Sequence, residues 1–518
     1  MTWAWQSPRK PASSNLMFHL VNRQNLGLIF GPVVFISMLL MPLPADMSPD
    51  ALKVAAVACL MAIWWVSEAA PIAATALLPI VLFPLLGVMS TAATTSAYAN
   101  QLIYLFMGGF LIAVTMQKWN LHRRIAMVTL RKVGVSPNRI ILGFMLATAL
   151  LSMWISNTAT AMMMLPIGMA VINQVDVLQS ADQSNSPEAV QVDSNFGICL
   201  MLSIAYSASI GGVATLIGTP PNAILAGMVE KLYGQTISFA SWLAFGLPLS
   251  LVMLTVTWFY LTRIAYPVRS ADLPGVNKVI DRELSQLGPI NREEKWVLGV
   301  FLAVSSAWIA RGIINIPALS MVTDASIAMA GALLLFIIPS NLAQREFLLD
   351  WKTAAGIPWD IIILFGGGFA LAQGFSESGL SGWIADQLIS LEGTSLATMI
   401  AVVTLTVIFL TEVTSNTATA TLMIPVLGAL SIAVGIHPYS LMVPAAIAAS
   451  FAFMLPVATP PNAIVFSSRC VTIPQMAKAG IWLNILAVGL ISLFVLYLLP
   501  LVWGIELAVI PDSLINGD

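Results

Sequence analysis

Two short polar motifs, each present twice, are the parts of this chain whose residue types and spacing could do chemistry. The first is Ser-Asn-Thr-Ala-Thr, at residues 156–160 and again at 415–419. The second is Thr-Pro-Pro-Asn-Ala-Ile, at residues 219–224 and again at 459–464. Hydroxyl and amide side chains in apolar sequence compete with the helix for backbone hydrogen bonds, so each motif predicts a helix break. Two matched pairs of breaks indicate one site shared by two repeats.

A half-helix that begins at such a motif would point the free N–H groups of its first turn into the break. We expect Ser156 or Asn157 to cap a half-helix that starts around Ala159, and Thr219 to cap one that starts at Pro220. The second copy of each motif repeats the arrangement. Helix N-termini carry partial positive charge and bind anions through their amides. Four of them predict an anion site.

The distribution of basic residues agrees with an anion site of this kind. No Lys or Arg occurs from residue 140 to 230 or from 353 to 468, the stretches that contain all four motifs. A bound anion would therefore be held by amides, hydroxyls and helix dipoles.

The other side of each break would present carbonyl oxygens, such as those of Gly218 and Ala458, to a hard cation. Ser152 and Thr411 lie four residues before the two Ser-Asn-Thr motifs, so each adds a hydroxyl on the same helical face. The sequence therefore predicts one sodium site in each repeat.

The composition is that of an integral membrane protein. The 518 residues are 58% hydrophobic and 9% charged, and the mean hydropathy is +0.89. Apolar segments of about 20 residues, enough to cross a bilayer as helix, recur along the whole chain. Alternating strand patterns are absent. The predicted fold is an all-α polytopic membrane protein with inverted repeats, about 11 transmembrane helices and two re-entrant hairpins, divided into scaffold and transport domains.

The duplication extends beyond the motifs. Residues 104–113 align with 363–372 at an offset of 259, which is also the difference between 415 and 156. The Thr-Pro-Pro motifs are offset by 240 (459 minus 219), and we assign the 19 missing residues to the polar stretch 174–195.

The predicted domains are a tail and scaffold helices (1–98), a first repeat core (99–232), connecting helices and a cytoplasmic loop (233–358), a second repeat core (359–478), and a last helix with its tail (479–518).

The charges predict the orientation. A basic amphipathic segment at 118–139 corresponds to an acidic one at 377–392, so the repeats should be inverted. With a cytoplasmic amino terminus and an uncleaved first span, all but three of the 22 Lys and Arg residues fall in cytoplasmic segments, as the positive-inside rule requires. The expected location is the cell (inner) membrane.

These residues resemble the divalent anion/sodium symporter family, which is marked by paired Ser-Asn-Thr motifs at two hairpin tips and paired Thr-Pro motifs at two helix breaks. The resemblance implies hairpins at about 140–173 and 396–436. It implies a first sodium site at Ser152, Ser156, Asn157 and Gly218, and a second at Thr411, Thr414, Ser415, Asn416 and Ala458. It implies contacts with substrate carboxylates from Ser156, Asn157, Thr158, Thr219, Ser415, Asn416, Thr417 and Thr459.

The resemblance also implies a secondary active transporter for sodium-coupled uptake of C4-dicarboxylates such as succinate, fumarate and malate. Family members work as homodimers that move a transport domain as an elevator. A sodium-independent dicarboxylate exchanger, or a citrate or sulfate carrier of the same family, remains an alternative, as does an anion channel. The partners are then the anion, sodium ions and the lipid bilayer. No other cofactor and no nucleic acid are expected.

An enzyme would need clustered His, Cys or paired carboxylates at membrane depth, and the sequence shows none, so no enzymatic activity is expected. The three cysteines show no CxxC spacing, so neither a disulfide framework nor a zinc site is expected.

Two further expectations concern charge. Glu412 stands alone in its apolar segment, where a structural hydrogen bond is favoured over proton transfer. A dianion with two sodium ions is electroneutral, so we predict a third coupling cation that draws on the membrane potential.

Overall fold

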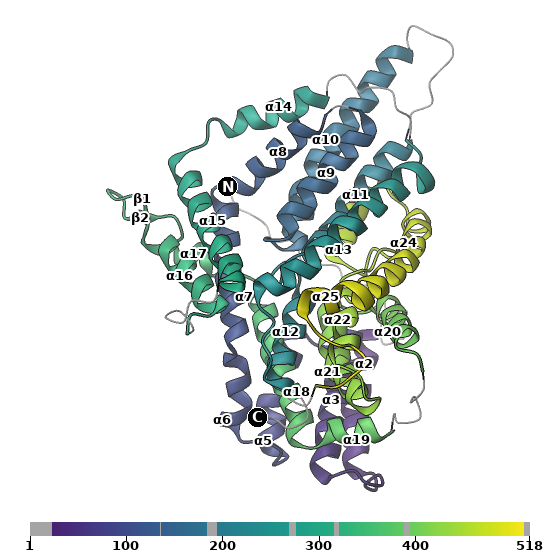
Figure 1. Ribbon diagram of the computed structural model, residues 1–518. Coiled ribbons are helices and arrows are strands. Elements are labelled where there is room, and N and C mark those ends of the chain that lie inside the picture. The colour runs from purple at the N-terminus through teal and green to yellow at the C-terminus, as the bar shows by residue number, and fades with distance from the viewer. Residues whose placement is uncertain are drawn as a thin grey trace, which may run out of the picture.

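The computed structural model describes residues 23–134, 136–183, 194–268, 276–314, 321–387 and 394–511. These residues form almost only helices (Figure 1). The exception is a small antiparallel pair, β1 (Pro339–Asn341) and β2 (Glu346–Phe347).

In the first half of the chain the helices are α2 (Arg23–Leu40), α3 (Pro49–Ser67), α4 (Ile72–Ala76), α5 (Leu78–Leu85), α6 (Thr91–Ser96), η1 (Ala97–Ala99), α7 (Gln101–Lys118), α8 (Leu121–Val133), α9 (Pro137–Ser152), α10 (Asn157–Gln183), α11 (Ser194–Val213), α12 (Pro220–Tyr233), α13 (Phe239–Tyr260) and η2 (Leu261–Ala265). In the second half they are α14 (Val276–Leu287), α15 (Arg292–Ile313), α16 (Asp324–Ile337), α17 (Trp351–Ala354), α18 (Trp359–Glu377), α19 (Leu380–Gln387), α20 (Leu396–Thr411), α21 (Asn416–Ala433), α22 (Tyr439–Ala448), α23 (Pro460–Ser467), α24 (Ile473–Leu493), η5 (Phe494–Leu498) and α25 (Leu499–Trp503).

The membrane spans agree in number with the prediction. Ten described helices are long and apolar enough to cross a bilayer, and two of these, α10 and α21, are arms of the hairpins. Shorter apolar helices supply three more segments, which we assign as spans: α4 with α5, α16, and α22 together with α23. The described residues therefore provide 11 spans and two re-entrant hairpins.

The two hairpins enter from opposite ends of the molecule. The first, α9 with α10, lies in the upper half of Figure 1, and the second, α20 with α21, lies in the lower half. Each hairpin reverses over a few residues, at 153–156 and at 412–415. The two hairpin tips therefore meet near the middle of the molecule, as inverted repeats require.

The broken helices cross each other in a matched way. In the first, α11 ends at Val213 and α12 begins at Pro220, and in the second, α22 ends at Ala448 and α23 begins at Pro460. The half-helix α11 packs against α23, while α12 packs against α22. Each repeat's second hairpin arm also packs against the other repeat, α10 on α23 and α21 on α12. The two halves therefore build one site together.

The surface helices that follow α7 and α18 lie at opposite ends of the molecule. The basic helix α8 lies with α14 at the top of Figure 1, whereas α19 lies at the bottom. Arg124 pairs with Glu294 at 3.0 Å, and Arg131 pairs with Asp281 at 3.5 Å.

The extra length assigned to residues 174–195 is partly helix, because α10 continues to Gln183. The rest of that insertion, 184–193, lies outside the described residues.

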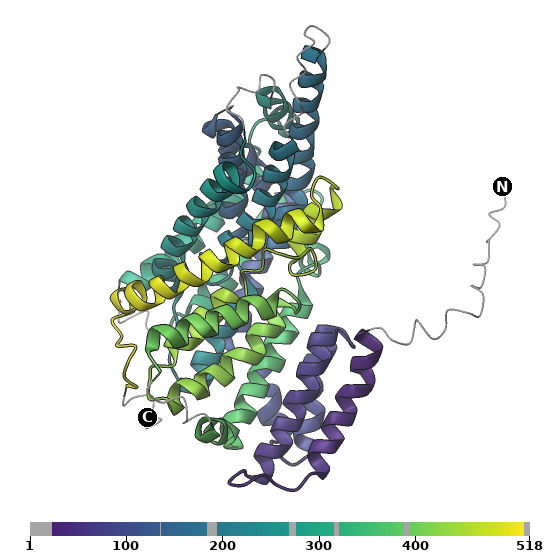
Figure 2. The same cartoon turned by 90° about the vertical axis from the view of Figure 1, so that its right-hand side faces the viewer.

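The first helices form a separate unit on one side of the lower half, seen at the right of Figure 2. There α2 and α3 pack side by side, and a second hydrophobic cluster joins α3 and α5 to α18 and α19. On the other side α16 packs along α7. The helix α13 contacts α9 and α11, so it is attached to the first hairpin.

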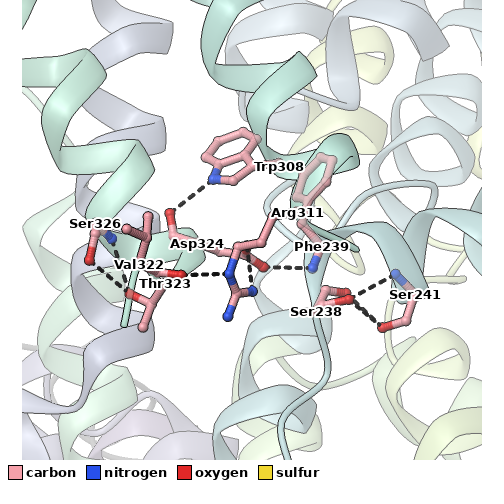
Figure 3. A network of polar contacts seen from close by, with 9 residues as sticks. All are labelled: Ser238, Phe239, Ser241, Trp308, Arg311, Val322, Thr323, Asp324 and Ser326. Carbon is pink, nitrogen blue, oxygen red and sulfur yellow. Dashed lines mark hydrogen bonds and ion pairs between the residues drawn. The ribbon is translucent and has the colours of Figure 1, made fainter. Parts of the chain in front are cut away.

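A polar joint connects α13 to α15 and α16 (Figure 3). Asp324 accepts the backbone N–H of Phe239 at 2.8 Å and pairs with Arg311 at 3.0 Å. Its backbone carbonyl accepts the indole N–H of Trp308 at 2.9 Å. The Arg311 Nε also donates to the carbonyl of Val322. The start of α13 is thus bonded to α16, which Arg311 and Trp308 bond to α15, and both α15 and α16 pack against α7.

Candidate functional site

All four motifs line one cavity of about 390 Å³. The eight residues predicted to contact substrate carboxylates all belong to its wall: Ser156, Asn157, Thr158, Thr219, Ser415, Asn416, Thr417 and Thr459. Four of these residues, Ser156, Asn157, Ser415 and Asn416, are also predicted sodium ligands, and three further predicted ligands, Gly218, Thr414 and Ala458, line the same cavity. The apolar part of the wall includes the paired rings of Phe106 and Phe110. The volume is in the range of small-molecule sites.

The hairpin tips place helix N-termini at the cavity. The arm α10 begins at Asn157, two residues earlier than expected, and Ser156 Oγ accepts the N–H of Ala159 at 3.3 Å. The arm α21 begins at Asn416 with Ser415 as its N-cap residue, although that side chain makes no capping bond. First-turn amides have no partner within their own helix. Both tips therefore offer N–H donors and positive helix ends to an anion.

Behind the first tip, three oxygen atoms converge. The Ser152 hydroxyl lies 2.5 Å from Asn157 Oδ1 and 2.6 Å from the carbonyl oxygen of Ala208. Ser152 is fully buried. A hydroxyl has one proton and can satisfy only one of these acceptors at a time. The remaining lone pairs suit a hard cation.

The second tip repeats this cluster. The Thr411 hydroxyl lies 2.8 Å from Asn416 Oδ1 and 3.0 Å from the carbonyl oxygen of Ala449. Thr414, also predicted as a ligand, bonds to the carbonyl of Leu410 at 2.8 Å. The carbonyls of Ala208 and Ala449 were missed by sequence reasoning, because a backbone oxygen leaves no mark on the residue type.

The Thr-Pro-Pro motifs start the second half of each broken helix as expected. Thr219 and Thr459 are the extended N-cap residues of α12 and α23, and each is followed by a proline at the first helical position. Only Thr459 caps through its side chain, to the N–H of Asn462. The hydroxyl of Thr219 instead faces Ser450 Oγ of the other repeat at 3.3 Å.

The asparagine of each Thr-Pro-Pro-Asn motif closes the break. Asn222 Nδ2 donates to the carbonyl of Thr215 at 2.8 Å, with longer contacts to Gly212 and Val213. Asn462 Nδ2 donates to the carbonyls of Ala452 and Leu455, both at 3.0 Å. These bonds satisfy carbonyls that the interrupted helices leave without partners. The asparagines hold the shape of the break.

Glu412 is a buried hydrogen-bond acceptor in the second tip. Its carboxylate accepts the backbone N–H groups of Phe453, Met454 and Leu455 at 2.7, 2.9 and 3.1 Å. Asn484 Nδ2 of α24 donates to it at 2.7 Å. The side chain thus joins the second break and α24 to the hairpin. The first repeat has Met153 at the matching position.

The cavity wall also contains an ion pair that sequence reasoning missed. Arg23, at the start of α2, and Glu68, just after α3, line the cavity and lie 2.9 Å apart. Both come from a part of the chain that precedes the first motif by almost 90 residues or more. The expectation of a site without basic side chains holds for the two motif-bearing stretches, but not for the whole wall.

The sequence matches the family described as the sodium:sulfate symporter transmembrane region over residues 22–510. It is 45% identical to the sodium-dependent dicarboxylate transporter SdcS of Staphylococcus saprophyticus over 505 residues, covering 95% of this chain and 96% of the relative. It is 46% identical to SdcS of Staphylococcus aureus over 487 residues, covering 93% of each chain.

Two solved structures share the fold at 12% sequence identity. The YdaH transporter of Alcanivorax borkumensis has a TM-score of 0.54 and covers 79% of this chain and 87% of its own. MtrF of Neisseria gonorrhoeae, described with a class of antimetabolite efflux pumps, has a TM-score of 0.55 and covers 92% and 95%. Because the family match covers nearly the whole chain, the protein belongs to the sodium:sulfate symporter family of membrane transporters, the divalent anion/sodium symporters.

Proposed function

We propose that the protein is a secondary active transporter that takes up C4-dicarboxylates together with sodium ions. One observation carries the proposal: both copies of both motifs line a single cavity. Relatives at 45% and 46% identity are named sodium-dependent dicarboxylate transporters. Succinate, fumarate and malate are the proposed substrates.

The anion is bound at the hairpin tips and at the Thr-Pro-Pro breaks. Ser156, Asn157 and Thr158 bind one carboxylate, and the matching residues of the second tip bind the other. Thr219 and Thr459 add hydroxyls from the breaks. Two carboxylates joined by a short chain suit two tips that face one cavity from opposite repeats.

Each sodium ion is bound behind one tip. The first takes Ser152, Ser156, Asn157 and the carbonyl of Gly218. The second takes Thr411, Thr414, Ser415, Asn416 and the carbonyl of Ala458. The two matched oxygen clusters support this assignment, because Ser152 and Thr411 each lie within hydrogen-bond distance of the following asparagine's Oδ1. A cation that orders the tip would prepare the amides for the anion, and this couples the two.

Transport moves one part of the molecule against the other as an elevator. The packing supports a transport domain of α9 to α13 and α20 to α24, and a scaffold of α2 to α7 with α15 to α18. Scaffold helices also form the proposed homodimer. The protein lies in the cell (inner) membrane with its amino terminus in the cytoplasm, so that α8 and α14 face the cytoplasm.

The test is succinate uptake by proteoliposomes with Asn157→Ala or Asn416→Ala. Each change removes an Oδ1 from one oxygen cluster and a polar contact from the cavity, so we expect sodium-dependent uptake to be lost while the protein still inserts and purifies. Gly299→Ala on α15 is a control, because a Cβ there meets nothing within 4 Å. Normal uptake by both asparagine variants would refute the site.

The substrate and the stoichiometry need separate measurements. Uptake of succinate, malate, citrate and sulfate, with and without sodium, separates the proposal from a sodium-independent exchanger and from a sulfate or citrate carrier. A third coupling cation would gain roughly 2.3 kcal/mol per 100 mV. We therefore expect succinate to evoke an inward current in reconstituted, voltage-clamped membranes, and strictly electroneutral uptake would exclude the third cation.

A further inference from the structure

Arg23 and Glu68 carry the full charges of the cavity wall. Among the described residues that line it, the others are hydroxyls, amides, glycine and apolar side chains. Arg23 Nη2 lies 2.9 Å from Glu68 Oε2. A dianion in the cavity therefore has one cationic group within the wall, the Arg23 guanidinium, and this group is already paired with the Glu68 carboxylate.

Close packing of α2 on α3 fixes the position of the arginine. Arg23, Gly27 and Gly31 are spaced by four residues and so lie on one face of α2. A Cβ at Gly27 would lie 1.9 Å from Ser67 Oγ, and one at Gly31 would lie 2.6 Å from Trp64 Nε1. Only glycine permits this approach of the two helices. Arg23 is thereby held next to the end of α3.

The partner is held at the end of α3. Glu68 ends this helix with φ of 54°, in the left-handed region, and its N–H bonds to the carbonyl of Trp64. A left-handed residue is a common way for a helix to end. The chain turns away after α3 at this residue. Its carboxylate remains beside Arg23 at the cavity.

The pair can exchange partners. The two side chains are 52% and 44% exposed, and an ion pair as exposed as this is held weakly. A substrate carboxylate can accept the same kind of charge-assisted bond from the guanidinium as the Glu68 carboxylate does. Both residues lie on the proposed scaffold, whereas the hairpin tips lie on the proposed transport domain. The guanidinium therefore meets the anion only where the transport domain brings the tips to this wall.

We propose that Arg23 is a binding contact for the dianion on the scaffold side of the cavity, and that Glu68 competes with the anion for it. This inference rests on the proposed function. The Arg23 guanidinium attracts the dianion into the cavity and binds one of its carboxylates. Re-formation of the ion pair with Glu68 then releases the anion.

The two residues therefore have opposite effects on the KM for succinate. Glu68→Gln leaves Arg23 free for the anion, so KM falls roughly threefold and the maximal rate falls with it because release is slower. Arg23→Gln leaves the Glu68 carboxylate facing the dianion, so KM rises by a similar factor. The double variant lies between the two, and Arg23→Lys stays close to the parent. Because the effect is electrostatic, the difference shrinks when choline chloride is raised at constant sodium.

The controls separate this role from a structural one. Lys53→Gln breaks the 2.7 Å pair with Asp50 on α3, and neither residue lines the cavity, so its KM is unchanged. Sodium-dependent uptake by the parent protein is measured first, and its absence would refute the proposed function and this inference together. Where the parent transports succinate, KM values that shift in the same direction, or not at all, overturn this inference alone. If Arg23→Gln does not fold, Glu68→Gln still decides it, because an unchanged or raised KM in that variant overturns the inference.

Discussion

Gly212→Ala should weaken sodium binding at the first oxygen cluster. Gly212 lies in the last turn of α11, and a Cβ there would stand 2.7 Å from Asn157 Oδ1 and 3.1 Å from the carbonyl oxygen of Gly218. Ordinary contact begins at 3.4 Å, so the nearer oxygen has to move by about 0.7 Å. Both oxygens belong to the proposed first sodium site.

The size of the effect follows from the tolerance of metal sites. Ligand distances are held to about 0.2 Å, and a misplacement of 1 Å costs about 100-fold in a positioned reaction. A displacement of about 0.7 Å should therefore raise the sodium concentration for half-maximal uptake about 10- to 100-fold, which is about 1.4 to 2.8 kcal/mol. Alanine favours helix over glycine by up to about 1 kcal/mol, so the fold is retained.

The assay is sodium titration of succinate uptake in proteoliposomes. Gly299→Ala is the matched control, since its Cβ would meet nothing within 4 Å. The reasoning would be refuted by a Gly212→Ala variant whose sodium dependence equals that of the parent.

Three other predictions concern the fold around the site. Asn222→Asp removes the donor that holds the Thr215 carbonyl and should lower the melting midpoint in detergent, at a cost of about 1–3 kcal/mol; an unchanged midpoint would exclude its role in closing the break. Glu412→Gln should destabilise the protein by about 2 kcal/mol, through one lost charge-assisted bond, and leave the shape of the pH profile of uptake intact; a lost pH dependence would assign proton transfer instead. Burial lowers the pKa of His437, in the connection between α21 and α22, to about 4. In the unfolded chain the His437 imidazole has its ordinary pKa of about 6.5 and is protonated at a higher pH than in the folded protein, so the free energy of unfolding should fall as the pH drops from about 6.5 to 4. Melting curves of His437→Asn should lack that part of the pH dependence.

The parts of the site that come from doubled, helix-breaking sequence were predictable. Proline at the first helical position and a hydroxyl residue before it place the start of α12 and α23, and the constant spacing of the repeats pairs the two tips. The start of α10 differs slightly from the prediction, because both Ser156 and Asn157 can cap a helix. The helix was expected to start around Ala159 and starts at Asn157. Eight of the assigned spans follow from apolar segment lengths, whereas α4 with α5, α16, and α22 with α23 are shorter.

The rest depends on contacts between distant segments. The carbonyls of Ala208 and Ala449 join the oxygen clusters because α11 and α22 pass behind the tips, and no residue type encodes this. The three amides that bind Glu412 become available only when the second helix breaks. Arg23 reaches the cavity through the packing of α2 on α3, so its sequence position in the tail region does not reveal it.

The joint between α13 and α16 bears on how fast such a molecule can work. Under the proposed elevator movement, the Phe239 amide and the Asp324 carboxylate belong to parts that travel past each other. The bond between them must then open and re-form once in every transport cycle, while Arg311 holds the carboxylate and Trp308 holds the backbone of Asp324. A bond that stabilises this conformation also raises the barrier to leaving it, so a weaker joint would shorten the time spent in this conformation and raise the turnover rate.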